Sequence, residues 1–134
     1  MSEYVLQLLI AAIMVVEAPV NEKHAQAAIE REGSYGVMQI RQPCLSHVNE
    51  KRGTNLHLND VRISPELSAW VFRQYVQINK CTTPEQAART WNGGPRGPHK
   101  KATEAYWRKV SEEMARIQFQ LAAQRVRKLY GKGL

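Results

Sequence analysis

Glu17 is the residue with the clearest potential for chemistry, because it directly follows an apolar run. The run spans Val5–Val16 and reads VLQLLIAAIMVV. Burial disfavours the ionised form of a carboxyl group, so such a helix is expected to raise the pKa of Glu17. A carboxylic acid that stays protonated near neutral pH can donate its proton to the leaving oxygen of a glycosidic bond. The alternative is that Glu17 marks the solvent-facing end of the helix, since Glu is almost never fully buried.

The string GSYGVMQI follows at residues 33–40 and supplies candidate contacts to a saccharide. Gly36 permits a close backbone approach that a side chain would block. The amide of Gln39 can both donate to and accept from sugar hydroxyls and N-acetyl groups. Tyr35 and Met38 are also candidate substrate contacts, although Met38 has an alternative interpretation as a core residue. We assign Ile40 to the core.

Two later strings, ARTWNGG at 88–94 and TEAYWRKV at 103–110, add further candidates. Trp91 offers a flat apolar face for a pyranose ring. Asn92 could hydrogen-bond an acetamido group or a hydroxyl, or it could be a turn residue, since Asn readily forms turns. Tyr106 carries a hydroxyl that could orient a neighbouring acid or the substrate, but a buried Tyr needs a hydrogen-bond partner in any case.

Taken in order, these features resemble the recurring strings of the lytic transglycosylase and goose-type lysozyme family. Those strings are a helix-end Glu, G-L-M-Q, A-Y-N-x-G and T-x-x-Y-V-x-x-V, and the resemblance covers residues 17–110. It implies a mainly α, lysozyme-like domain with at most a small β-hairpin. It also implies cleavage of the β-1,4 bond between N-acetylmuramic acid and N-acetylglucosamine in peptidoglycan glycan strands, with Glu17 as general acid and then base. Proton transfer by a carboxylic acid is sufficient for this reaction, so no metal or organic cofactor is expected.

The chain departs from the family pattern at three places. Ala18 stands where many members have Ser, and Trp91 replaces the usual Tyr. Glu30 falls where goose-type enzymes place one Asp, while Arg41 occupies the position of their other Asp. The last departure bears on the mechanism, because an inverting hydrolase needs a second carboxylate.

Two mechanisms remain open from the sequence. In a hydrolytic muramidase, Glu30 would be the second catalytic carboxylate, with Glu32 as a neighbouring candidate. In a lytic transglycosylase, the N-acetyl group of the substrate attacks the anomeric carbon, and Glu17 then takes the proton of the muramoyl 6-hydroxyl to give a 1,6-anhydro sugar. We favour transglycosylation, because one goose-type acid is lost.

The charge of the chain is concentrated near its C-terminus. Of the 134 residues, 1–94 carry nine basic and nine acidic side chains, whereas 95–134 carry ten basic and three acidic ones, giving the net charge of +7. A basic stretch attracts polyanions, and here these would be anionic wall polymers or lipid. Nucleic-acid binding is disfavoured, since no recognised module is evident. A non-catalytic wall-binding protein that keeps the cleft is the alternative of a different class.

The length predicts a single monomeric domain over 1–134, with a basic helical extension from about residue 115. The N-terminal run has no basic n-region or cleavage site and is shorter than a membrane span. We therefore expect cytosolic synthesis with action at the bacterial wall, as for a bacteriophage lysis or virion enzyme. The two cysteines, Cys44 and Cys81, match no metal motif and are expected to be free thiols.

Local signals divide the chain into helices joined by turns. Pro19 ends the first helix, Gly53 stops the second, and Ser64-Pro65 and Thr83-Pro84 begin two more. The last helix carries an interrupted apolar stripe, and we expect a solvated basic helix that packs one side on the core. The expected helices are 5–16, 43–52, 64–79, 83–91 and 102–130, with a loop at 55–61 and irregular chain or a hairpin at 18–35.

Overall fold

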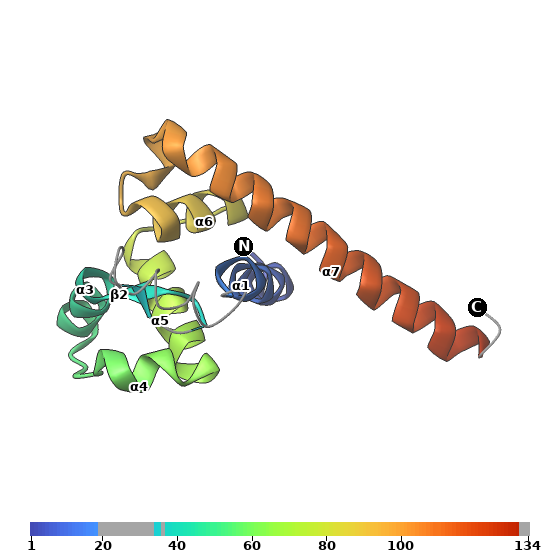
Figure 1. Cartoon of the computed structure of the whole chain (residues 1–134), viewed down its shortest axis with the longest axis horizontal. Coiled ribbons are helices and arrows are strands. Elements are labelled where there is room, and N and C mark those ends of the chain that lie inside the picture. Colours follow the sequence, from blue (N-terminus) through green and yellow to red (C-terminus); the bar gives the residue numbers. More distant parts are fainter. Residues whose placement is uncertain (19–33, 36, 132–134) are drawn as a thin grey trace.

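The computed structural model describes residues 1–18, 34, 35 and 37–131 and is mainly helical, which confirms the predicted fold class (Figure 1). The strands form one two-residue antiparallel pair that pairs Ser34 with Arg41 and Tyr35 with Ile40. In chain order the elements are α1 (Glu3–Glu17), β1 (Ser34–Tyr35), β2 (Ile40–Arg41), α3 (Gln42–Arg52), α4 (Leu58–Arg62), α5 (Pro65–Ile78), α6 (Pro84–Gly93), the 3₁₀ turns η1 (Gly97–His99) and η2 (Lys101–Thr103), and α7 (Glu104–Tyr130).

The helix boundaries are set by side-chain caps and by glycines with positive φ. Ser64 Oγ accepts from the backbone N–H of Leu67 at 3.0 Å, and Thr83 Oγ1 accepts from that of Gln86 at 3.2 Å. Each bond satisfies one of the N–H groups that the first turn of a helix leaves without a partner. Gly53 ends α3 with φ of 65°, a conformation that glycine adopts without strain. The starts of α5 and α6 and the end of α3 therefore lie where the sequence predicts them.

Helix α4 corrects the prediction that residues 55–61 form a loop. The sequence offers no side-chain cap for it, and His57 at the N-cap position makes no capping hydrogen bond. Tertiary packing stabilises the turn instead. Val61 is fully buried, and its carbonyl oxygen accepts from the Ser68 hydroxyl on α5 at 2.8 Å. Packing of this kind routinely overrides local propensity in short segments.

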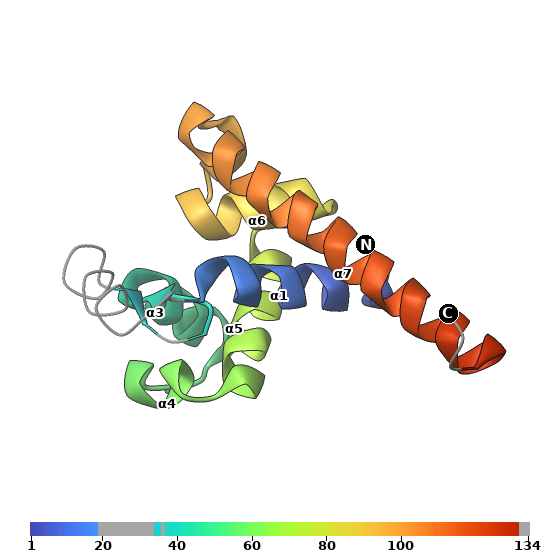
Figure 2. The same cartoon turned by 45° about the vertical axis from the view of Figure 1, so that its right-hand side comes forward.

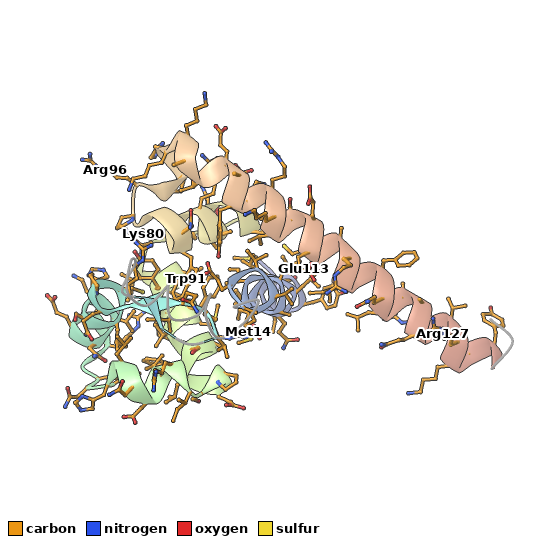
Figure 3. All side chains as sticks on the ribbon, viewed as in Figure 1. Met14, Lys80, Trp91, Arg96, Glu113 and Arg127 are labelled. Atoms are coloured by element: carbon orange, nitrogen blue, oxygen red, sulfur yellow. The ribbon has the colours of Figure 1, made fainter. Side chains whose placement is uncertain are left out.

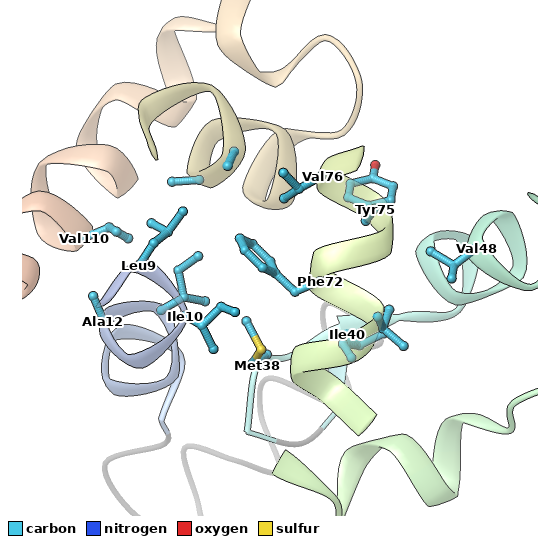
Figure 4. Packing of buried hydrophobic residues seen from close by; sticks show 14 of the residues in the cluster. Leu9, Ile10, Ala12, Met38, Ile40, Val48, Phe72, Tyr75, Val76 and Val110 are labelled. Carbon is cyan, nitrogen blue, oxygen red and sulfur yellow. The ribbon is translucent and has the colours of Figure 1, made fainter. Parts of the chain in front are cut away.

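The hydrophobic core is formed by residues of the hairpin, of α3 to α7 and of α1, and Figure 4 shows the part of it around α1. Phe72 from α5 and Val110 from α7 approach α1 from different sides and are fully buried. Met38 and Ile40 bring the hairpin into the same core. Because the middle of the helix that ends in Glu17 is buried, core packing fixes the direction in which this helix ends. The buried residues of α1 are Leu8, Leu9, Ile10, Ala12 and Ile13.

Helix α7 has two parts with different surroundings. Its first half lies beside α1 and α6, and its second half extends beyond the other elements (Figures 1 and 2). Side chains of the second half stand out from the ribbon around the labelled Arg127 (Figure 3). Val110 is fully buried, whereas Phe119 and Leu129 are exposed. The expectation that this helix packs one side on the core therefore holds for the first half and is wrong for the second.

No helix in the described part of the chain combines the length and apolarity needed to cross a membrane. Cys44 and Cys81 are both free thiols, as predicted.

Candidate active site

A pocket of about 520 Å³ lies where the C-terminal end of α1, the hairpin, α3 and the end of α6 meet. It brings together four of the predicted site residues, although they are up to 75 positions apart in the sequence (17 to 92). These four are Glu17, Gln39, Trp91 and Asn92. A carboxylic acid, two amides and an aromatic ring therefore share one cavity, which is the combination expected of a polar site with a few oriented groups.

Glu17 is the last residue of α1, and its side chain is partly buried. The helix ends at Ala18, whose extended backbone donates its N–H to the carbonyl of Val15 at 3.3 Å. The turn thus delivers the Glu17 carboxylate from the core to the wall of the pocket. Glu17 is at a helix end, as predicted, but it is not simply solvent-facing, and its catalytic role stays a prediction.

The Tyr106 hydroxyl lies behind Glu17, in the first turn of α7. Burial, and then the nearby charge of the Glu17 carboxylate, raise the pKa of Tyr106 well above its ordinary value. The hydroxyl oxygen is buried, and in the described part of the chain no partner meets normal hydrogen-bond geometry with it. Catalytic hydrogen bonds are often long or misaligned before substrate binds. Tyr106 is not among the residues that line the pocket, and its role towards Glu17 or the substrate stays a prediction.

The turn of the hairpin separates two predicted substrate contacts. Gln39 has φ of 53°, in the left-handed region, and lines the pocket. Met38, one residue earlier, is fully buried in the core. The prediction of a substrate contact by Met38 is therefore wrong, and its alternative interpretation as a core residue is confirmed. The left-handed residue allows neighbouring side chains to point to the core and to the pocket within one tight turn.

Trp91 both lines the pocket and holds its wall in place. Its indole N–H donates to the carbonyl oxygen of Met38 at 3.2 Å, which ties α6 to the hairpin. Its ring makes edge contacts with Phe72 and Tyr75, with centroid separations of 5.1 and 5.8 Å. These contacts fix the ring in one orientation, so a sugar would meet a rigid surface. The tie to the hairpin could not be inferred from the sequence.

The strings ARTWNGG and TEAYWRKV are connected through Thr103. Its buried hydroxyl accepts from Arg89 Nε at 2.8 Å and donates to the carbonyl of Gly97 at 2.6 Å. A Cβ at Gly93 would lie 2.6 Å from Thr103 Cγ2, so this glycine permits the close approach of η2 to α6. Thr103 thus positions the start of α7, and with it Tyr106, relative to the Asn92 side of the pocket.

Basic and titratable groups on the pocket wall were missed as site candidates. Arg41, His47 and Lys100 all line the cavity, and Lys100 Nζ donates to the carbonyl of Gly93 at 2.7 Å. Cys44 lies one turn before His47 on α3, and burial raises the pKa of its thiol to about 12. The spacing of Cys44 and His47 by three residues puts them on one helix face, a signal that could have been used.

Several predicted residues cannot be assigned to the pocket. Glu30, Glu32 and Gly36 lie outside the described residues, and Tyr35 is described only by its backbone in β1. Among the described residues that line the pocket, Glu17 is the sole carboxylate. Within that same part of the chain, no three His, Cys, Asp or Glu side chains are grouped closely enough to hold a metal ion.

No protein-family model matches this chain, and neither a curated protein nor a solved structure matches it.

Proposed function

We propose that this chain is a peptidoglycan-cleaving glycosidase of the lytic transglycosylase type, acting on the β-1,4 bond between N-acetylmuramic acid and N-acetylglucosamine. The observation that carries the proposal is the placement of Glu17, which is delivered by a buried helix into a pocket that also holds Gln39 and Asn92. The resemblance of the four sequence strings to this family supports the choice of substrate.

The lining of the pocket suits an N-acetylated sugar. The amides of Gln39 and Asn92 can each donate and accept, which matches both the hydroxyls and the acetamido groups of the glycan. The fixed ring of Trp91 offers apolar contact area to a pyranose. Arg41 and Lys100 add positive charge to the same wall, and peptidoglycan carries carboxylates on its lactyl and peptide groups.

The proposed reaction needs one carboxyl group in two protonation states. Glu17 donates its proton to the glycosidic oxygen as the C1–O4 bond breaks, while the acetamido oxygen of muramic acid bonds to C1. The Glu17 carboxylate then takes the proton from the 6-hydroxyl, O6 bonds to C1, and the acetamido oxygen leaves. No water is consumed, and the muramoyl product is a 1,6-anhydro sugar. Tyr106 acts as a positioning residue by limiting where the Glu17 carboxylate can lie.

We prefer transglycosylation to hydrolysis because of Arg41 on the pocket wall. A hydrolase of the inverting type requires a second carboxylate that activates water. The pocket wall has a cation, Arg41, where the goose-type pattern has an acid, and Glu17 is the one carboxylate among its described residues. An arginine remains protonated in proteins and cannot be a general base near neutral pH.

The test compares Glu17→Gln with Glu50→Gln, which removes an exposed carboxylate on α3 outside the pocket. Clearing of purified peptidoglycan is measured by turbidity, and binding by co-sedimentation with the same material. We expect Glu17→Gln to bind but to lose at least 1,000-fold in cleavage, while Glu50→Gln behaves like the native chain. Cleavage by Glu17→Gln at the native rate would refute the assignment, and binding without cleavage by the native chain would favour a wall-binding protein.

A further inference from the structure

The second half of α7 exposes large apolar side chains that the core does not use. Phe119, Leu129 and Tyr130 are 74%, 70% and 75% exposed, and Leu121 and Val126 are exposed as well. Isolated exposed apolar residues are ordinary on protein surfaces, but a contiguous apolar patch marks an interaction site. The question is therefore whether these residues form one patch.

The helical repeat divides the apolar residues of α7 between two opposite faces. Val110 and Ile117 belong to the face that contacts the core. Phe119 is nine residues after Val110, and at about 100° per residue this places it on the opposite side of the helix. The residues of the second face recur at alternating intervals of four and three, which keeps them in one stripe. They are Ala115, Phe119, Ala122, Val126 and Leu129.

Within residues 115–130, which contain this stripe, every charged side chain is basic. Glu113 is the last acidic residue of the chain, and it forms an ion pair with Arg116. Beyond it, α7 carries Arg125, Arg127 and Lys128 in its last two turns, all exposed. The end of α7 is therefore an amphipathic helix whose polar side is basic.

We propose that residues 115–130 of α7 bind the surface of an anionic lipid bilayer. Such a helix lies in the plane of the interface, with its apolar side chains at the boundary of the acyl chains and its basic groups among the phosphates. A second copy of the chain fits poorly on the same stripe. The dimer would bring Arg116, Arg125 and Arg127 of both copies together, and residues 115–130 hold no acidic side chain to offset this charge.

The position of the stripe leaves the bilayer accessible to it. The described body of the molecule packs on the opposite face of α7, along the side of Val110 and Ile117. The sixteen residues span about 24 Å at 1.5 Å per residue. Most of this segment extends beyond the other elements (Figures 1 and 2). The helix can therefore lie flat on a membrane while the pocket stays on the far side. This proposal does not depend on glycan cleavage.

Co-sedimentation of the full chain with vesicles tests the proposal. The vesicles contain either phosphatidylcholine alone or equal parts of phosphatidylcholine and phosphatidylglycerol. We expect binding to the anionic vesicles only, with affinity that falls as salt is raised from 50 to 500 mM. The variant Phe119→Ser/Leu129→Ser is expected to lose about 100-fold in affinity, on the order of tenfold for each side chain. Its matched control is Ile63→Ser, which removes an apolar side chain that is 73% exposed at the end of α4.

The basic groups are tested separately. Arg125→Gln/Arg127→Gln/Lys128→Gln is expected to lose about 100-fold, since each basic group near an anionic surface contributes about fivefold. The control Lys51→Gln/Lys80→Gln/Lys101→Gln changes the net charge equally on other elements and should retain most of the affinity.

Three results would overturn the proposal. The first is affinity for anionic vesicles that is unchanged in the Phe119→Ser/Leu129→Ser variant, which would mean that charge attraction alone accounts for binding. The second is the absence of vesicle binding together with dimers in light scattering that this variant abolishes, which would assign the stripe to a second copy. The third is tighter, salt-sensitive binding to an oligonucleotide than to anionic vesicles.

Discussion

Gly97 begins η1 and packs against the backbone of α6 at Arg89. A Cβ built on Gly97 would lie 1.8 Å from the carbonyl oxygen of Arg89 and 2.5 Å from its carbonyl carbon. Both atoms belong to a helix backbone, so they cannot move away as the end of a flexible side chain can. Replacing Gly97 by Ala must therefore displace η1 from α6.

The size of this displacement indicates how much stability Gly97→Ala should lose. Cβ contacts shorter than 3.0 Å essentially do not occur, so η1 must move by at least the difference between 3.0 and 1.8 Å, which is 1.2 Å. The hydrogen bonds from Gly97 N to Gly94 O at 2.7 Å and from Thr103 Oγ1 to Gly97 O at 2.6 Å would both be broken by this shift. Each buried bond that is lost costs about 1–3 kcal/mol, so the loss of both should destabilise the fold of Gly97→Ala by about 2–6 kcal/mol.

Urea unfolding followed by circular dichroism measures this loss. The control is Gly53→Ala. Position 53 also favours glycine, because its φ is 65°, but a Cβ at this position would have no atom within 4 Å. Its cost should be about 1 kcal/mol, from backbone strain alone. Equal destabilisation of the two variants, or a native-like midpoint for Gly97→Ala, would refute the argument from close approach.

Three further predictions concern the pocket. Burial raises the pKa of the Cys44 thiol to about 12, so its stabilising contribution is complete below the ordinary pKa of a thiol, about 8.5, and is lost as the pH rises towards 12. Between pH 8 and pH 10.5, the free energy of unfolding should therefore fall more for the native chain than for Cys44→Ala. An equal change in the two chains would contradict the burial of the thiol. Trp91→Phe removes the N–H donor to Met38 and should cost about 1–2 kcal/mol in thermal unfolding, whereas an unchanged midpoint would mean that the bond is not needed. Tyr106→Phe should reduce the cleavage rate about 10- to 100-fold with little change in glycan binding; a loss of binding instead would make Tyr106 a substrate contact.

The helices were largely predictable from the sequence because their signals are local. Ser64 and Thr83 cap the first turn of a helix with groups that lie three residues apart, and Gly53 ends one by its own backbone preference. Helix α4 was not predictable in this way, because its stability comes from the burial of Val61 against a different segment.

The candidate site was predictable where the chemistry of a side chain indicated its role. Glu17, Gln39 and Asn92 were selected for their chemistry and lie in one pocket. Met38 was misassigned because the positive φ of Gln39 turns the backbone between the two residues. The side chain of Met38 therefore faces the core, and this could not be inferred from the sequence. The links made by Trp91 and by Thr103 join segments distant in the sequence, so no local pattern indicates them.

The surroundings of the end of α7 could not be predicted from hydrophobic periodicity. The sequence shows an apolar stripe, but the same pattern is expected whether the stripe packs on the protein core or on another surface. Only the burial of Val110 and the exposure of Phe119 distinguish the two faces.

Mass spectrometry of the products from purified peptidoglycan tests the central claim most directly. We expect 1,6-anhydromuropeptides from the native chain and no products from Glu17→Gln, because Glu17 is both the acid and the base of the proposed reaction. Reducing-end products, heavier by one water, would contradict transglycosylation and direct attention to Glu30. Anhydro products from Glu17→Gln at the native rate would contradict the role of Glu17 itself.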